Sequence, residues 1–234
     1  MGSKMLHVSW DPVLIGISFV VAFIASFIAL DSAGKVAISN RRESTFWRLS
    51  GGATLGMGIW SMHFIGMLAM KMSMPINYHF SLTAFSFLIA LISATLAINI
   101  AISGQTLSAR RLIVATSLLS TGVVTMHYVG MVAIVEHVAI RWQFSLILLS
   151  VVIAIIASGI GLWLAFHLQQ NTRRALINRL IAALVMALAI ASMHYTGMGA
   201  ATFTHFGHTA HDGLSTLELS IWVCAVTLVI LGIM

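Results

Sequence analysis

The most constraining feature of this sequence is a series of long apolar segments that contain almost no charged side chains. Seven of them follow one another, at residues 13–30, 49–70, 82–103, 112–135, 144–166, 177–201 and 217–234. Each is close to the roughly 20 residues that a helix needs to cross the hydrocarbon core of a bilayer. Because backbone polar groups in lipid must be paired within the chain, each segment is expected to be a helix. The sequence therefore predicts an all-α integral membrane protein with seven transmembrane helices.

The composition of the chain also favours a membrane protein. Hydrophobic residues make up 59% of its 234 residues and charged residues only 8%, whereas a soluble domain carries about 25% charged residues. The net charge of +6 does not indicate a nucleic-acid partner, because the basic side chains lie in loops between apolar segments. The lipid bilayer is the expected partner instead. A signal peptide is a weaker interpretation of the first segment, which is too long and has no small-residue cleavage site after it.

Positive charge is divided unequally between the two sets of loops, and this division predicts the orientation. The loops after the first, third and fifth segments carry nine basic residues, whereas the opposite side carries three, Lys4, Lys71 and Arg141. Basic loops stay in the cytoplasm, so the amino terminus is predicted outside and the carboxyl terminus inside. The nine are Lys35, Arg41, Arg42, Arg48, Arg110, Arg111, Arg173, Arg174 and Arg179.

The two ends of the chain are expected to be artificial. Residues 1–4 read as an expression scar, so the membrane domain is assigned to residues 5–234. The last apolar segment reaches residue 234 without a basic stop or a polar tail. We therefore expect that a cytoplasmic output domain has been removed after the seventh helix.

A seven-residue pattern occurs three times, late in the second, fourth and sixth segments. Residues 61–67, 125–131 and 192–198 each read small hydroxyl, Met, His, aromatic, any residue, Gly, Met. Three copies at near-equal spacing define an internal repeat. The repeat unit is predicted to be a helical hairpin, occurring three times and followed by one extra helix. Small residues within the segments, such as Ser93, Gly58 and Gly122, indicate close contact between helices.

The motif histidines are the strongest candidates for a functional site. Apart from two tyrosines, His63, His127 and His194 are the only ionisable side chains in the middle of the apolar segments, and such groups are costly in a membrane. Residues four apart share a helix face, so each histidine lies on one face with the last methionine of its motif. Imidazole combined with thioether sulfur selects copper, especially Cu(I). The predicted metal ligands are therefore the three histidines, then Met67, Met131 and Met198, and then Met62, Met126 and Met193.

The three Met-His-aromatic-x-Gly-Met stretches resemble the MHYT domain of bacterial integral membrane sensors, over residues 8–234. Only the third copy reads Met-His-Tyr-Thr in full, and Phe64 replaces the tyrosine in the first. The resemblance implies a place in the bacterial inner membrane, copper as Cu(I) or Cu(II), and sensing of O₂, CO or NO. It also implies a cytoplasmic output such as a diguanylate cyclase or phosphodiesterase, and hence control of cyclic-di-GMP turnover.

Four functions remain open from the residues themselves. The first is a sensor of a diatomic gas or of redox state. The second is a copper transporter or carrier, although the inner half of the helices has few soft ligands. The third is haem ligated by two of the histidines, and the fourth is a structural bundle whose histidines are hydrogen-bonded. Outer groups that favour the second function are Met70, Met72, Met74, His79, His205, His208, His211 and Asp212.

Catalysis within this chain is not expected. The sequence shows no carboxylate pair, no nucleophile–base arrangement and no glycine loop that would bind phosphate. It leaves open whether the three motifs form one site or several, and whether the chain forms a homodimer.

Overall fold

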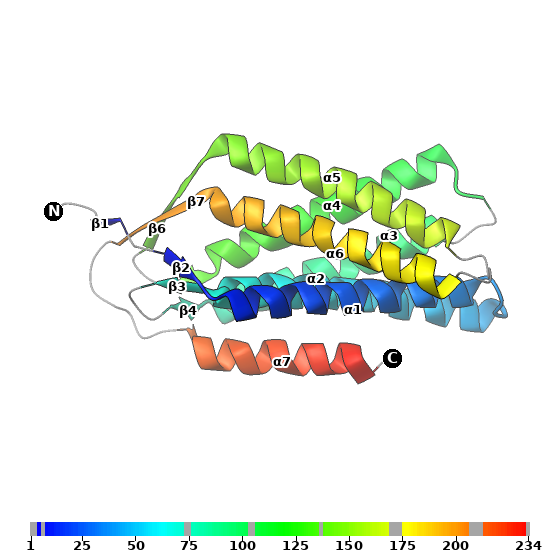
Figure 1. The fold of residues 1–234 in the computed structure, drawn as a ribbon, viewed down its shortest axis with the longest axis horizontal. Helices are drawn as coiled ribbons and strands as arrows, with labels where there is room; N and C mark the ends of the chain where they lie inside the picture. Colours follow the sequence, from blue (N-terminus) through cyan, green and yellow to red (C-terminus); the bar gives the residue numbers. More distant parts are fainter. Residues whose placement is uncertain are drawn as a thin grey trace.

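The computed structural model describes residues 4–5, 8–72, 76–102, 106–135, 138–168, 175–205 and 213–232. Seven helices run side by side along the long axis of the molecule (Figure 1). Each coincides with one of the predicted apolar segments, which confirms the all-α class. The helices are α1 (Pro12–Val36), α2 (Arg41–Ala69), α3 (Phe80–Ile102), α4 (Ala109–Val132), α5 (Phe144–His167), α6 (Ala175–Gly199) and α7 (Thr216–Gly232).

Five of these helices, α1, α3, α4, α5 and α6, are long and apolar enough to cross a membrane. The protein is therefore a multi-pass membrane protein. α2 is not among the five because it is adapted to protein rather than to lipid: nearly all its residues from Gly51 to Ala69 are buried. α7 contributes a shorter apolar stretch, Thr216–Ile230.

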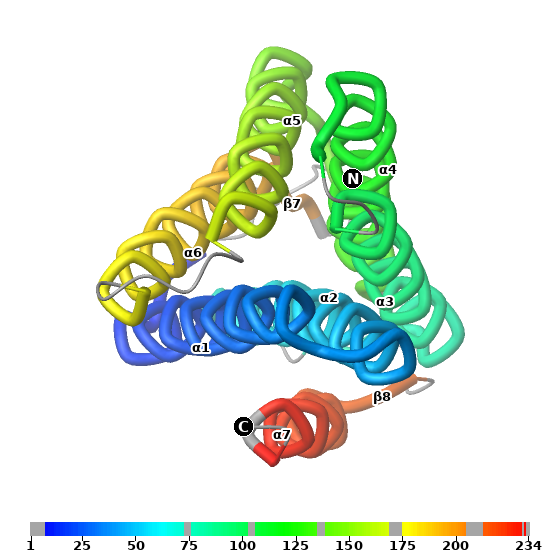
Figure 2. Tube along the Cα trace, turned by 90° about the vertical axis from the view of Figure 1, so that its right-hand side faces the viewer, coloured from blue at the N-terminus to red at the C-terminus, as the bar shows by residue number. Residues whose placement is uncertain are grey.

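Seen along the bundle, the first six helices form a triangle whose sides are helix pairs (Figure 2). α1 lies beside α2, α3 beside α4 and α5 beside α6, and α7 packs outside the triangle against α2. Gly58 of α2 faces Ala25 of α1, and Gly122 of α4 faces Ser93 of α3, so closely that an added Cβ would collide. The predicted close contacts through small residues are confirmed at these positions.

Short strands, which the sequence analysis did not predict, cap one end of the bundle (Figure 1). Three antiparallel pairs each join the start of an odd helix to the end of the even helix that follows it in the chain. Backbone N–H groups at Asp11, His79 and Gln143 also donate to carbonyl groups at the ends of α2, α4 and α6, which would otherwise lack partners. The pairs are β2 (Val8–Trp10) with β3 (Met70–Met72), β4 (Asn77–Tyr78) with β5 (Ile134–Val135), and β6 (Val138–Trp142) with β7 (Ala201–His205). Two further strands extend them, because β1 (Lys4–Met5) pairs with β7 and β8 (Leu214–Ser215) pairs with β4.

At the opposite end, several helices begin earlier than their apolar segments. Asn40 caps α2 and forms a capping box with Glu43, and Ser108 caps α4, so polar side chains fix these starts. The expectation that the basic residues near these positions lie in loops is therefore wrong. Those within helices are Lys35, Arg41, Arg42, Arg48, Arg110, Arg111 and Arg179.

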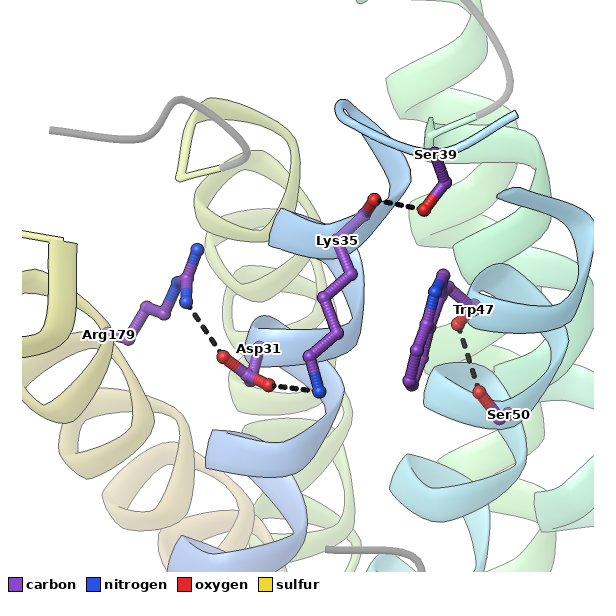
Figure 3. A network of polar contacts seen from close by, with 6 residues as sticks. All are labelled: Asp31, Lys35, Ser39, Trp47, Ser50 and Arg179. Carbon is purple, nitrogen blue, oxygen red and sulfur yellow. Dashed lines mark hydrogen bonds and ion pairs between the residues drawn. The ribbon is translucent and has the colours of Figure 1, made fainter. Parts of the chain in front are cut away.

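A charged network ties three helices together at this end (Figure 3). Asp31 of α1 accepts a hydrogen bond from Nη1 of Arg179 of α6 at 2.7 Å, and its other oxygen is 2.9 Å from Nζ of Lys35. The same Lys35 ammonium lies 4.4 Å from the ring centroid of Trp47 in α2. The network thus links α1 to both α6 and α2.

Candidate metal centre

The three motif histidines converge on one point in the core of the bundle. His63 of α2, His127 of α4 and His194 of α6 are at most 1% exposed. Their Nδ1 atoms form a triangle: 3.1 Å from His63 to His127, 3.1 Å from His63 to His194, and 3.3 Å from His127 to His194. The three motifs therefore form one shared cluster, a question that the sequence left open.

The motif glycines make room for these imidazole rings. Each ring has its Nε2 edge against a glycine on another of the three helices, where a Cβ would overlap the ring. The contacts run in a circle, from α2 to α4, from α4 to α6, and from α6 back to α2. The histidine and glycine partners are His63 with Gly130, His127 with Gly197, and His194 with Gly66.

The three histidines cannot satisfy one another by hydrogen bonding. A neutral imidazole has one donor nitrogen and one acceptor nitrogen, and burial in an apolar bundle disfavours the charged form. Around a ring of three Nδ1 atoms, donors and acceptors cannot alternate, so at least one contact pairs like with like. All three Nε2 atoms are buried and have no hydrogen-bond partner among the described residues. Packing histidines would be expected to have partners, so this arrangement favours a ligand at the Nδ1 atoms.

The nitrogen spacing fits a metal ion. A cation bonded to three imidazole nitrogens at about 2.0–2.1 Å in tetrahedral geometry holds them about 3.3–3.4 Å apart. The observed Nδ1 separations of 3.1–3.3 Å are close to that value. These histidines can therefore hold a metal ion. Three protein ligands would leave a fourth position open to another ligand, as in catalytic rather than structural sites.

The six motif methionines are all buried. Met62 packs against Ala22 of α1 and Ala187 of α6, and Met193 lines an apolar cavity beside the cluster. Burial brings these sulfur atoms into the same core as the histidines without assigning them to a metal. A ligand role stays a prediction for Met67, Met131 and Met198, and for Met62, Met126 and Met193.

The aromatic residue of each motif stacks edge-on against its own histidine, with ring centroids 4.7–4.8 Å apart. The hydroxyl of Tyr128 is hydrogen-bonded to Ser150 of α5 at 2.7 Å, and that of Tyr195 to Ser18 of α1 at 2.9 Å. Phe64 has no hydroxyl, and here Ser86 of α3 accepts a hydrogen bond from the indole N–H of Trp60 at 3.1 Å instead. A buried serine on an odd helix therefore supports every motif.

Sequence reasoning missed these serines, although a signal was present. Ser18, Ser86 and Ser150 recur with nearly the same spacing as the histidines. Each also lies eight residues after an aromatic residue of the strand layer, namely Trp10, Tyr78 or Trp142.

These strand aromatics cover the motif aromatics from the capped end. Trp10 contacts Tyr195 with centroids 5.9 Å apart, Trp142 contacts Tyr128 at 5.4 Å, and Tyr78 contacts Phe64 at 6.2 Å. Burial raises the pKa of the Tyr78 hydroxyl, so it stays neutral. The histidine layer is thus closed toward the strands by three aromatic pairs.

The outer groups that favoured a transporter are only partly visible. Met70 is buried and pairs with Trp10 in the strand layer, so it serves packing. Met74, His208 and His211 lie outside the described residues, as does the side chain of His205.

Comparison with known proteins agrees with the repeated geometry. Residues 56–115 and 121–178 each match the MHYT family, described as a bacterial signalling protein N-terminal repeat. The chain belongs to the MHYT family. The first matched unit contains His63 and the second His127, whereas the motif around His194 lies beyond both.

Curated relatives match nearly the whole of this chain over only part of their own length. The chain is 40% identical over 231 residues to the bifunctional diguanylate cyclase/cyclic di-GMP phosphodiesterase MucR of Pseudomonas aeruginosa, covering 98% of this chain and 34% of that protein. It is 34% identical over 227 residues to the signaling protein YkoW of Bacillus subtilis, covering 96% and 28%. It is 32% identical over 200 residues to the cyclic di-GMP phosphodiesterase NbdA of Pseudomonas aeruginosa, covering 85% and 25%. The chain thus spans about a third or less of each relative. No solved structure matches it.

Proposed function

We propose that this MHYT chain is the membrane-embedded sensory input domain of a larger signalling protein in the bacterial inner membrane. In this proposal His63, His127 and His194 bind a transition metal, copper favoured, and the domain senses a diatomic gas (O₂, CO or NO) or redox state. The observation that carries the proposal is the triangle of Nδ1 atoms 3.1–3.3 Å apart. Neutral imidazoles cannot satisfy such a triangle among themselves, whereas a soft cation can.

The methionines support copper over zinc. Side chains on a helix point back over the preceding turn, so Met67, Met131 and Met198 are directed toward the histidine layer from the capped side. No described cysteine or carboxylate joins the histidine cluster, and thioether with imidazole is a donor set that selects copper. When bound, copper would supply one-electron redox chemistry and an open position for a gas molecule. The chain's own residues hold the imidazoles in place and exclude water.

Haem is a poorer fit to this site. A haem ligated by two of the histidines would place its macrocycle between imidazoles whose Nδ1 atoms are already only 3.1–3.3 Å apart. The site would have to open before such a group could enter.

The proposed architecture is three helical hairpins plus α7, with all seven helices in the membrane. Each hairpin is closed by one strand pair, and neighbouring hairpins are joined by a hydrogen bond between an aromatic residue in or next to the motif and a serine of the next odd helix. α6 meets α1 through Tyr195 and Ser18, as α4 meets α5 through Tyr128 and Ser150. The two family matches each begin in an even helix, α2 or α4, and run into the next hairpin. A third unit with the same start would begin in α6 and continue in α1, so it is split between the two ends of the chain.

We further propose that the strand-capped end lies outside the cell and the charged end in the cytoplasm. Most described basic residues are at the charged end, as expected for cytoplasmic loops. The names of MucR and NbdA assign cyclic-di-GMP chemistry to those proteins. We propose that the present domain likewise controls cyclic-di-GMP turnover by an output outside this chain, and that the chain itself is not an enzyme.

Metal analysis tests the core of this proposal. The chain, purified in detergent without a histidine tag and loaded with Cu(I) under reducing conditions, is expected to retain about one copper ion. The variant with His63→Ala, His127→Ala and His194→Ala should retain none. The matched control is His79→Ala with His167→Ala, which removes exposed histidines outside the cluster and should leave copper bound.

Three results would contradict the proposal. Equal copper in the wild type and in a still-folded triple variant would remove the histidines as ligands. A visible haem band in the purified protein would replace copper by haem. In the full-length protein, a rate of cyclic-di-GMP turnover that changes with neither gas nor copper would contradict the sensory role.

A further inference from the structure

An apolar cavity lies on the bundle axis next to the histidine cluster. It is lined by the residues four and eight positions before each histidine, which share a helix face with it. The cavity therefore extends from about 6 Å to about 12 Å below the histidine layer, toward the charged end. These six lining residues are Ile59, Leu55, Val123, Leu119, Ile190 and Met186.

The cavity suits a small apolar molecule. Its volume of about 30 Å³ exceeds the roughly 10–15 Å³ that one water-sized molecule needs. Among the described residues that line it, Ser158 alone has a polar side chain and none is charged. Cavities with so few polar partners do not hold water and bind apolar guests. Met193, which directly precedes His194, also lines it, so an occupant would be close to the cluster.

A groove on the outside of the bundle lies next to this cavity. It runs between α5 and α6 and is lined by apolar side chains such as Ile156, Ile160 and Val185, which are exposed on the surface that faces lipid. Groove and cavity share three lining residues, namely Ala157, Met186 and Ala189. Two of these side chains are single methyl groups, and the third is an unbranched chain that adapts its shape easily.

The opening occurs at this helix pair for a reason visible in the sequence. Five residues before each histidine, α2 has Gly58, α4 has Gly122 and α6 has Ala189. The two glycines lie directly against Ala25 of α1 and Ser93 of α3, so those helix pairs are closed. The methyl group of Ala189 keeps α6 from approaching α5 as closely. The third pair therefore combines small side chains with a groove between its helices.

We propose that the groove between α5 and α6 is a lateral entrance through which a small apolar molecule passes from the membrane hydrocarbon into the cavity beside the histidines. Its occupant is a molecule of about two heavy atoms without charge or strong polarity, because the lining offers shape but almost no hydrogen bonding. Such molecules concentrate in hydrocarbon rather than in water. This inference rests on the proposed function in one respect, since the molecule that enters is the one sensed at the metal.

Xenon is a suitable probe because it is apolar, of similar size, and independent of copper. The chain is labelled with ¹³C at its methionine methyl groups, placed in lipid nanodiscs without metal, and titrated with xenon pressure by NMR. Saturable shifts are expected at Met186 and Met193, which line the cavity. Met131, buried one turn to the capped side of His127, is the internal control and should not shift.

Two variants with opposite expected effects test the entrance. Ala157→Leu fills the passage, and the xenon response at Met193 should fall at least about fivefold, whereas Met186→Ala widens it and should strengthen that response. Leu148→Phe adds bulk on the lipid-facing side of the same helix, outside the groove, and should change nothing. Opposite signs in the first two variants cannot arise from general unfolding.

The outcomes separate this inference from the proposed function. No xenon response at Met186 and Met193, or one that Ala157→Leu leaves unchanged, overturns the cavity or the entrance. A xenon response that follows these predictions supports the entrance even if copper analysis fails. If Ala157→Leu binds as much copper as the wild type, the passage is separate from the metal ligands, as proposed. Loss of copper in that variant, still folded, would contradict this separation.

Discussion

The capped half and the charged half of this bundle are organised in opposite ways. In the capped half the same contacts recur three times, with each histidine against a glycine of another helix and each motif aromatic edge-on against its own histidine. In the charged half, Asp31, Arg179 and Lys35 form a network that involves only α1, α6 and α2. The histidine cluster therefore involves α2, α4 and α6 alike. At the far end, the charged network ties the one corner of the triangle where α1 meets α6 and α2.

The largest expected effect breaks the repeated layer in the capped half. Gly130→Ala would place a methyl group where the Nε2 edge of His63 lies and push the imidazole out of the triangle. Overpacking of this kind costs about 1–3 kcal/mol of stability, and copper affinity should fall about 10–100-fold, as expected for loss of ligand positioning. Copper competition with a chelator and thermal unfolding would measure both.

A matched glycine serves as the control for this variant. Gly16 of α1 has no atom within 4 Å of an added Cβ, so Gly16→Ala should leave copper affinity unchanged. Unchanged affinity in Gly130→Ala as well would mean that the glycine does not set the position of the histidine.

The next effect breaks the charged half and should leave the repeated layer intact. Asp31→Asn removes the charged acceptor of Arg179, whose side chain is only 15% exposed, and should lower stability by about 1–2 kcal/mol. Copper affinity should stay within about twofold, because affinity changes beyond that need a change at or next to the ligands. Lys35→Met, which keeps an apolar side chain over Trp47, should cost less. A joint loss of copper in Asp31→Asn would show that the two halves are coupled.

The contrast also explains how much could be predicted from the sequence. His63, His127 and His194 stood out as ionisable groups in apolar segments, and helix periodicity placed each on one face with the last methionine of its motif. Which glycine each histidine contacts depends on the rotation of α2, α4 and α6 about their axes, which no local pattern encodes. The contact of Gly66 with an imidazole of α6 is an example.

The strands and the helix starts escaped prediction for local reasons. β4 has two residues and β7 has five. β7 begins at Ala201, which is also the last residue of the sixth apolar segment. Such short stretches show no alternation that could be told from a helix end. The capping box of Asn40 and Glu43 is readable in the sequence, but it lies outside the apolar segment from which the helix bounds were taken.

A smaller loss of stability is expected from a change beside the histidine layer in the capped half. Tyr195→Phe removes the hydrogen bond to Ser18, whose hydroxyl keeps its bond to the carbonyl of Ile15 at 2.7 Å. Stability should fall by about 0.5–1 kcal/mol, with copper affinity unchanged, because Phe64 already occupies the same place in the first motif. Thermal unfolding of Tyr195→Phe beside copper competition would check this. Loss of copper in that variant would assign the hydroxyl a role at the metal.

The smallest effect lies at the strand cap. The hydrogen bond from Lys71, and then the N–H groups of Leu14 and Val13, lower the pKa of Asp11. A lowered pKa in the folded state contributes stability above the unfolded value of about 3.9, and this contribution is lost as pH falls through the folded pKa. Between about pH 5 and pH 3, wild type should therefore lose more thermal stability than Asp11→Asn. Parallel melting curves of the two proteins over that range would contradict the role of the pair.

The circle of histidine and glycine contacts also has a consequence for biosynthesis. A nascent chain that has inserted only α1 to α5 holds two of the three imidazoles, and Gly66 still lacks the ring of His194 that covers it. The centre comes into being in one step, when the sixth helix reaches the membrane and closes the ring. Under the proposed function, metal capture at this centre is therefore possible only once α6 has been inserted.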